Sequence, residues 1–382
     1  MHDRLLAALQ DIAQVSLVAA LRDDRLGFPD PKDLRVFIPD LHLISAQRQA
    51  TGGFHFSTNH ESLLVTLLGV LKSLKLAAAA DERVRVAQLG DILDLWREVP
   101  HIDPQEETAA RIANDHAELM NALRDPDLNA TLFLGNHDYE LYHWASYARC
   151  VRKLFIPVGD PQVLVLHGDV FDWIERFPDA VKEFLVYYFA AGTKPTNYAL
   201  GQMYQFVREA SPNPNDPAAI HCSTPARLNG LQAVAGGAIP ARFNLQRAGN
   251  AAANTTFLDM AYDAVGRPDN AYGFPVKTVI IGHTHQARIA VREENGGLFT
   301  LIDCGSWIEN CSVDGATNPL PSAQICALCG NEARIYQLAP LPAVAARIRR
   351  RRATGRRPAR RRTIRRPKAR GRTTRRRAAR AA

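Results

Sequence analysis

The segment VRVAQLGDILD, residues 84–94, is a mainly apolar run that ends in a glycine and two carboxylates. Its first part, Val84–Leu89, predicts a buried β-strand because it is short, contains valines and is closed by a glycine. Gly90 predicts a turn, which places Asp91 just beyond the carboxyl end of that strand. Because α/β folds commonly carry functional groups at this edge of the sheet, the segment indicates both a fold class and a site.

Four other segments share this arrangement, in which a short apolar run is followed by Asp, Asn or His. The runs are Leu34–Ile38, Thr131–Leu134, Val163–Leu166 and Val276–Ile281, and the residues after them are Asp40-Leu41-His42, Gly135-Asn136-His137-Asp138, His167-Gly168-Asp169 and Gly282-His283-Thr284-His285. Helices predicted over Ser62–Leu76 and Pro104–Arg124 separate the strands and indicate α/β layering. Each motif alone could be a turn or a helix cap, but five in order predict one convergent site.

The polar residues at these strand ends are of the types that bind divalent metal ions. We expect Asp91 to bridge two ions, since both of its carboxylate oxygens can act as ligands. Asp40, His42 and His285 would complete one site, and Asn136, His167 and His283 would complete the other. Asp40 and His42 are two residues apart, as are His283 and His285. In an extended segment residues i and i+2 point to the same side, so both members of each of these pairs would reach the site. Mn²⁺ is the expected ion, with Fe²⁺ or Zn²⁺ as alternatives, because the set contains no thiolate.

A site of this composition would attract a phosphate-containing substrate. Two divalent ions carry more positive charge than Asp40 and Asp91 neutralise, so the site would bind phosphate oxygens and acidify a water molecule. His137 follows the expected ligand Asn136 and is the candidate proton donor to the leaving oxygen. We expect Asp138 to orient His137.

Two more carboxylates complete the motifs. Asp94 and Asp169 are expected to hold histidines or water from behind the ligands rather than to bind the ions themselves.

Together the five motifs resemble the calcineurin-like metallophosphoesterase superfamily. The pattern of that superfamily is Asp-x-His, Gly-Asp-x-x-Asp, Gly-Asn-His-Asp/Glu, a lone His and Gly-His-x-His, and the resemblance covers about residues 34–310. It implies a metallo-dependent phosphatase-like fold, a two-sheet β-sandwich flanked by helices, with the seven residues above as metal ligands. It also implies a hydrolase of phosphoester or phosphoanhydride bonds, in which a hydroxide bridging the metals attacks phosphorus in line.

Within the superfamily the chain is most similar to the UDP-2,3-diacylglucosamine hydrolases. The similar segments are Asp40-Leu-His-Leu43, residues 90–96 and His167-Gly-Asp169. That branch cleaves a pyrophosphate in lipid A synthesis, which would make a nucleotide-lipid the substrate. It typically has Arg at the position of His137, so the chain departs from the branch there.

The chain divides into three expected regions. Leu5, Leu6, Leu9, Ile12 and Leu17 predict an amphipathic helix within residues 1–30. Residues 31–340 would form the phosphoesterase domain, with a helical cap inserted at about residues 172–275. The cap carries Phe184, Tyr187, Tyr188, Tyr204 and Phe206, which could line an acyl-chain site or only pack among themselves. Residues 341–382 are rich in arginine and too poor in apolar residues to fold alone, so we expect a disordered tail.

The net charge of +8 is unevenly distributed. Residues 340–382 hold 19 Lys and Arg and no Asp or Glu, so the remainder carries 28 basic and 39 acidic residues, a net charge of −11. The tail would suit an anionic polymer or an anionic membrane surface. Three alternatives therefore stay open: a nucleic-acid phosphodiesterase, a tail-tethered binding protein with a secondary metal site, and a solvated extension with no partner.

The composition is that of a globular protein, with 46% apolar and 23% charged residues. No run of about 18 apolar residues predicts a membrane span, and Asp3, Arg4 and Asp11 interrupt any secretory signal. We expect a cytoplasmic location, with peripheral attachment to the inner membrane surface as the alternative.

The chain has six cysteines. Cys326 and Cys329, with Cys304 and Cys311 upstream, could hold zinc, but buried free thiols are favoured.

Overall fold

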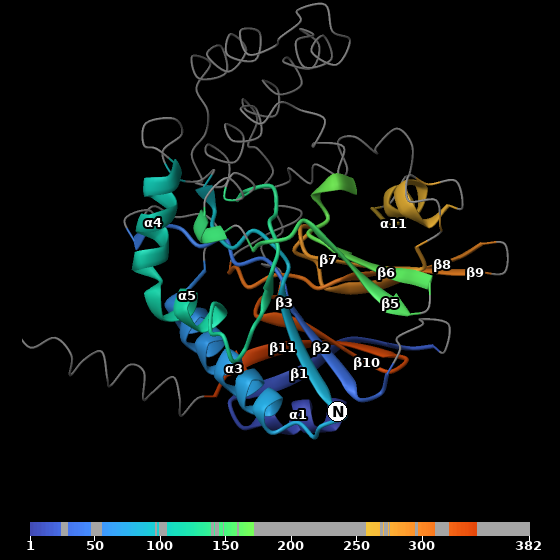
Figure 1. The fold of residues 1–382 in the computed structure, drawn as a ribbon, viewed down its shortest axis with the longest axis horizontal. Helices are drawn as coiled ribbons and strands as arrows, with labels where there is room; N and C mark the ends of the chain where they lie inside the picture. The colour runs from blue at the N-terminus through green and yellow to red at the C-terminus, as the bar shows by residue number, and fades with distance from the viewer. Residues whose placement is uncertain are drawn as a thin grey trace, which may run out of the picture. The chain divides into compact units, whose positions relative to one another are not determined.

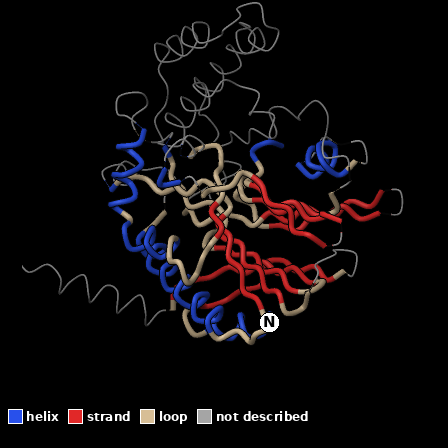
Figure 2. Tube along the Cα trace, in the orientation of Figure 1, coloured by secondary structure: helices blue, strands red, loops and turns tan. Residues whose placement is uncertain are grey.

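The computed structural model describes residues 1–23, 30–46, 56–95, 98, 105–138, 141, 145–147, 149–158, 160–171, 257–267, 270, 274, 276–294, 297–309 and 321–341. Residues Met1–Leu341 form one compact unit. Its described strands form two mixed sheets, as the sequence predicts (Figures 1 and 2).

The first sheet has six strands with a parallel half and an antiparallel half. Its spatial order is β1 (Ala13–Arg22), β11 (Glu332–Pro340), β10 (Gln324–Cys329), β2 (Asp33–Ile38), β3 (Arg83–Gln88) and β4 (Thr131–Leu132). Strands β2, β3 and β4 are parallel, and the remaining pairings are antiparallel. The three parallel strands are those predicted from their apolar runs.

The second sheet has five strands and the same division. Its order is β5 (Lys153–Val158), β6 (Asp160–Leu166), β7 (Thr278–Ile281), β9 (Gly297–Asp303) and β8 (Arg288–Glu294). Strands β6, β7 and β9 are parallel, while β5 and β8 pair antiparallel at the two edges. Strands buried on both faces are nearly continuous in apolar residues, which explains why β6 and β7 were predictable.

The two sheets pack face to face. One buried cluster contains side chains from both, including Phe37 and Leu89 from the β2–β3 side and Val163, Ile280 and Ile302 from the β6–β9 side. A second cluster covers the outer face of the first sheet and a third covers the outer face of the second. The described residues therefore form an α/β sandwich with helices outside both sheets, as Figure 1 shows.

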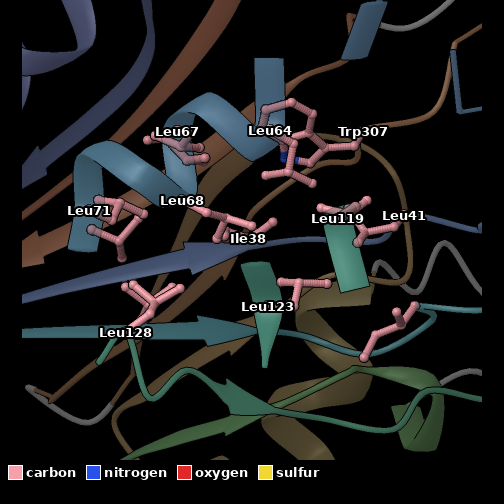
Figure 3. Packing of buried hydrophobic residues seen from close by; sticks show 14 of the residues in the cluster. Ile38, Leu41, Leu64, Leu67, Leu68, Leu71, Leu119, Leu123, Leu128 and Trp307 are labelled. Atoms are coloured by element: carbon pink, nitrogen blue, oxygen red, sulfur yellow. The ribbon is translucent and has the colours of Figure 1, made fainter. Parts of the chain in front are cut away.

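Helix α3 (Thr58–Leu76) is the main cover of the first sheet. Ser57 caps it by accepting a hydrogen bond from the backbone N–H of His60. Leucines at helical spacing are buried in the core; they are Leu63, Leu64, Leu67, Leu68 and Leu71. Figure 3 shows Leu64, Leu67, Leu68 and Leu71 in the same buried cluster as Ile38, Leu119, Leu123 and Trp307. Truncating one of these buried leucines to alanine would cost about 2–5 kcal/mol of stability.

The amino-terminal helix predicted for residues 1–30 is wrong in extent. Helix α1 (His2–Gln10) ends at Gln10, and the chain continues as β1, which pairs with β11. Leu5 and Leu9 pack in the core, so this segment belongs to the same compact unit. Leu17, which we assigned to the helix, lies in β1 and is 59% exposed.

The helix predicted over Pro104–Arg124 is divided. Helix α4 (Gln105–Asp115) and α5 (Ala117–Leu123) are separated by His116, whose φ and ψ of −115° and 35° are not helical. The side chain of His116 is buried and bonds to Glu61 and to the carbonyl of Ile44.

Part of the predicted cap is described. Within residues 172–275, helix α11 (Phe257–Ala261) and the π-helix η7 (Tyr262–Gly266) pack on the outer face of the second sheet. The aromatic residues expected to line the cap lie outside the described residues, as does the tail from residue 342 onward.

Candidate metal centre

The expected ligands all follow parallel strands. Asp40 and His42 follow β2, Asp91 follows β3, Asn136 and His137 follow β4, His167 follows β6, and His283 and His285 follow β7. Three groups of side chains each bring one carboxylate oxygen or imidazole nitrogen per residue within 4.8 Å of one another: Asp40 with His42 and His285, His42 with Asp91 and the proposed proton donor His137, and Asp40 with Asp91 and His167. The structure therefore gathers the carboxylates and histidines of all five motifs at one edge of the sandwich.

Asp91 occupies the middle of this group. Its Oδ2 atom lies 3.4 Å from Nε2 of His42 and 3.2 Å from Nε2 of His167. Its other oxygen, Oδ1, accepts a hydrogen bond from the backbone N–H of His137 at 2.9 Å. One carboxylate oxygen thus lies between imidazoles that come from different sheets.

On one side of Asp91, three side chains form a compact donor set. Nε2 of His285 lies 3.0 Å from Oδ2 of Asp40 and 3.1 Å from Nε2 of His42. A carboxylate with two converging imidazoles suits a divalent transition-metal ion.

On the other side, Nε2 of His167 is the common neighbour. It lies 3.1 Å from Oδ1 of Asn136 and 3.3 Å from Nδ1 of His283. Together with Asp91, these atoms offer an amide oxygen, two imidazoles and a carboxylate to a metal ion.

Hydrogen bonds behind the histidines select which ring nitrogen faces inward. Nδ1 of His42 lies 3.0 Å from Oδ2 of Asp94, and Nδ1 of His167 lies 3.0 Å from the carbonyl oxygen of Leu89. Because both partners are acceptors, each Nδ1 donates a hydrogen bond, so Nε2 is the nitrogen directed toward the centre and would bind a metal ion in its deprotonated form. This is the arrangement that orients metal-ligating histidines.

Two glycines leave room for the carboxylates. A Cβ atom on Gly135 would lie 2.0 Å from Oδ1 of Asp91, and one on Gly282 would lie 2.1 Å from Oδ1 of Asp40. No side chain fits at either position, so the glycine of each motif is needed for close approach.

Four of the expected ligands have left-handed backbone conformations. The φ angles are 48° at His42, 49° at Asp91, 63° at His283 and 59° at His285. Non-glycine residues rarely adopt this region, and such strain is concentrated at functional sites. It also corrects our expectation of extended ligand pairs: the members of each pair do converge, but through tight turns.

The predicted role of Asp138 in orienting His137 is wrong. Asp138 accepts hydrogen bonds from the backbone N–H groups of Gly135 at 2.8 Å and Ile92 at 2.7 Å, so it ties two loops together. The orienting group is Asp94, whose Oδ1 lies 2.8 Å from Nδ1 of His137. Asp94 therefore holds both His137 and His42, in line with the role expected for it.

Asp169 does not hold a histidine. Its carboxylate pairs with Arg152 at 3.0 Å, and Arg152 also donates to the carbonyls of Leu134 and Gly135. Arg152 thus supports the loop that carries Asn136. Sequence reasoning missed this residue, since an isolated arginine at the start of a strand gives no signal of its contacts.

The buried charges shift one another. Burial would raise the pKa of Asp91, but the neighbouring His167, His137 and His42 hold it well below its ordinary value. Burial alone would lower the pKa of His167, but the nearby carboxylates of Asp91 and Asp40 outweigh burial and raise this pKa to about 10. The pKa of Asp138 is raised to about 7 by burial and by Asp91, although backbone N–H groups oppose the shift.

The alternative of a zinc site at the cysteines is not supported. Cys326 lies in the cluster between the sheets with Cys304, whereas Cys329 lies in the cluster on the outer face. Residues three apart on strand β10 point to opposite faces, so Cys326 and Cys329 cannot share one ion. Cys311 lies outside the described residues.

No protein-family model and no curated protein matches this chain. Among the described residues, no helix is both long and apolar enough to cross a membrane.

Proposed function

We propose that this chain is a metal-dependent phosphoesterase of the calcineurin-like superfamily that uses two divalent ions, with Mn²⁺ as the first candidate. The observation that carries the proposal is the position of Asp91, because one of its carboxylate oxygens, Oδ2, lies between His42 and His167. A carboxylate between two sets of ligands is what a pair of ions requires.

The residues fit such ions in three respects. The donor atoms are carboxylate, amide and imidazole, which suit Mn²⁺, Fe²⁺ or Zn²⁺. The inward nitrogens are fixed by acceptors behind the rings of His42 and His167, and glycines leave space beside Asp40 and Asp91. When bound, the ions would supply positive charge for phosphate oxygens and acidify a water molecule.

His137 would act on the leaving group. Its Nδ1 lies 2.8 Å from Oδ1 of Asp94, and Nε2 would be the nitrogen that acts on the substrate. Burial lowers the pKa of His137, but Asp94 and Asp91 raise it above its ordinary value, which favours the protonated ring. The acidified water would first lose a proton to solvent. As the resulting hydroxide oxygen forms its bond to phosphorus and the phosphorus–oxygen bond to the leaving group breaks, Nε2 would give its proton to the departing oxygen.

The test is hydrolysis of bis-p-nitrophenyl phosphate and p-nitrophenyl phosphate by metal-stripped protein with and without Mn²⁺. Turnover that requires Mn²⁺ is expected, and His283→Ala should abolish it. His2→Ala is the matched control, because His2 lies in α1 and contacts the carbonyl of Glu332. Failure to bind Mn²⁺, Zn²⁺ or Fe²⁺, or bound metal without hydrolysis of a monoester, a diester or a pyrophosphate, would contradict the proposal.

A second candidate is a nucleic-acid phosphodiesterase, favoured by the composition of residues 340–382. Eighteen arginines, one lysine and no acidic residue in this segment suit phosphate backbones, and such binding weakens steeply with salt. Deleting residues 342–382 is expected to abolish salt-dependent binding to DNA or RNA while turnover of small substrates survives. Nucleic-acid binding that is unchanged after the deletion would exclude this role for the tail.

A further inference from the structure

We infer that Asp303 and Thr284 act together as positioning residues for His283 and His285, an inference that rests on the proposed metal site. Thr284 stands between the two histidines, and its hydroxyl donates a hydrogen bond to Oδ2 of Asp303. Neither residue belongs to the set of expected ligands.

The backbone conformation of the loop that carries both histidines is unfavourable by itself and has to be stabilised by contacts outside the loop. His283 and His285 both have positive φ, and Thr284 has a different backbone conformation between them. The backbone N–H of Thr284 donates to the carbonyl of Gly282 at 2.7 Å, which closes a tight turn. Positive φ costs energy in non-glycine residues, so the surroundings must fix the turn.

The side chain of Thr284 supplies that fixation. Besides donating to Asp303, its Oγ1 accepts a hydrogen bond from the backbone N–H of Gln286 at 3.3 Å. One hydroxyl therefore links the residue after the two histidines to a group outside the loop.

Asp303 provides a rigid anchor. It is the last residue of β9 and is completely buried, and its Oδ1 accepts from the backbone N–H of Gly305 at 3.4 Å. Arg288 lies opposite it across the β8–β9 pair, with Nε 3.7 Å from Oδ2. A strand-end carboxylate held by these groups moves little, so the hydroxyl bound to it is held as well.

The consequence is a link from the sheet to both halves of the metal centre. His283 lies beside His167, whereas His285 lies beside Asp40 and His42. Loss of the Thr284–Asp303 hydrogen bond should therefore weaken the binding of both metal ions, whereas loss of one ligand should mainly weaken the binding of the ion that it contacts. Residues that orient metal ligands typically contribute 10–100-fold to metal affinity.

The experiment is calorimetric titration of the metal-stripped full chain with Mn²⁺. Thr284→Val and Thr284→Ala, which remove the hydroxyl with different shapes, are expected to weaken binding about 10–100-fold, and Thr284→Ser should restore it. Thr300→Val is the matched control, because Thr300 is buried in β9 and its hydroxyl has no hydrogen-bond partner among the described residues. Circular dichroism of each variant is compared with that of the unmodified chain, and only variants with the same spectrum are titrated.

A double-mutant cycle with Asp303→Ala tests the coupling. If the two residues act as a unit, the double variant should bind Mn²⁺ no more weakly than either single variant. Affinity in folded Thr284→Ala equal to that of the unmodified chain, or fully additive losses in the cycle, would overturn this inference alone. Absence of Mn²⁺ binding by the unmodified chain would instead overturn the proposed function, and this inference with it.

Discussion

His137 is tied through Nδ1 to Oδ1 of Asp94 across 2.8 Å, although the two residues are 43 positions apart. The same carboxylate holds His42 through its other oxygen at 3.0 Å. Asp94 thus connects the proposed proton donor to a proposed metal ligand, and a change at this position should affect both.

Replacing Asp94 by Asn is expected to lower Mn²⁺ affinity about 10–100-fold and the rate of diester hydrolysis about 10²–10⁴-fold. The amide offers one acceptor and one donor, so one of the two histidines loses its partner and its preferred tautomer. Calorimetry and initial rates measure the two effects separately. Asp127→Asn, at an exposed position paired with Lys72, is the control and should change neither.

Asp138→Asn is expected to act on stability. Its carboxylate accepts from the backbone N–H groups of Gly135 and Ile92, and an amide nitrogen would face one of these donors. A buried unsatisfied donor costs about 1–3 kcal/mol, which denaturant unfolding would detect. A folded variant of unchanged stability that has lost only turnover would instead restore the catalytic role first expected for Asp138.

The glycines beside the carboxylates provide a third test. Gly135→Ala and Gly282→Ala place a methyl group against Asp91 and Asp40 respectively, at distances that no relaxed structure allows. We expect loss of measurable Mn²⁺ binding and a lower unfolding midpoint in each variant. Gly69→Ala in α3, where nothing lies within 4 Å of the added carbon, should instead stabilise the protein by about 0.5–1 kcal/mol.

The fold around the site was predictable where burial produces continuous apolar runs. Strands β2, β3, β4, β6 and β7 lie in such runs, and the expected ligands follow these strands. Two of the missed strands lack this signature: β5 contains Pro157 beside a register shift at the sheet edge, and β8 carries charged residues. Strand β10 begins with Gln324 and continues as a short apolar run, Ile325–Cys329, which periodicity cannot distinguish from a short buried helix.

The site was predictable in its members but only partly in their contacts. The five motifs predicted that seven candidate ligands would lie together, because residues that follow parallel strands meet at one edge of a sheet. The partner of His137 was wrong, since adjacency in sequence suggested Asp138 whereas loop geometry supplies Asp94. Arg152 and Asp303 act through contacts across strands, and a single sequence carries no signal of those.

Removing divalent ions is expected to lower thermal stability. Ions that bind only the folded protein stabilise it by about 2.7 kcal/mol at a free concentration about 100-fold above Kd. Asp40 and Asp91 are both buried, so the ions would also relieve their mutual repulsion. Thermal unfolding with Mn²⁺ and with a chelator measures the difference. The shift should vanish in His42→Ala and persist in His2→Ala; an equal shift in both variants would assign the stabilisation to another site.

His116 should make stability depend on pH. Its Nδ1 lies 3.1 Å from Oε1 of Glu61 and its Nε2 lies 3.0 Å from the carbonyl oxygen of Ile44. Two acceptors are satisfied only by the doubly protonated ring. Burial lowers the pKa of His116, but these partners raise it above the ordinary value of 6.5. Its contribution to stability is therefore complete below pH 6.5 and is lost as pH rises through the folded-state pKa.

The measurement is the unfolding free energy of the unmodified chain and of His116→Gln across this range. The difference should be largest near pH 6, at about 1–3 kcal/mol for charge-assisted hydrogen bonds, and should shrink at higher pH. His2→Gln is a control of opposite sign, because burial lowers the pKa of His2 and penalises the folded state at acidic pH. A difference for His116→Gln that stays constant with pH would show that the ring is neutral in the folded protein, with only one of its two acceptors satisfied.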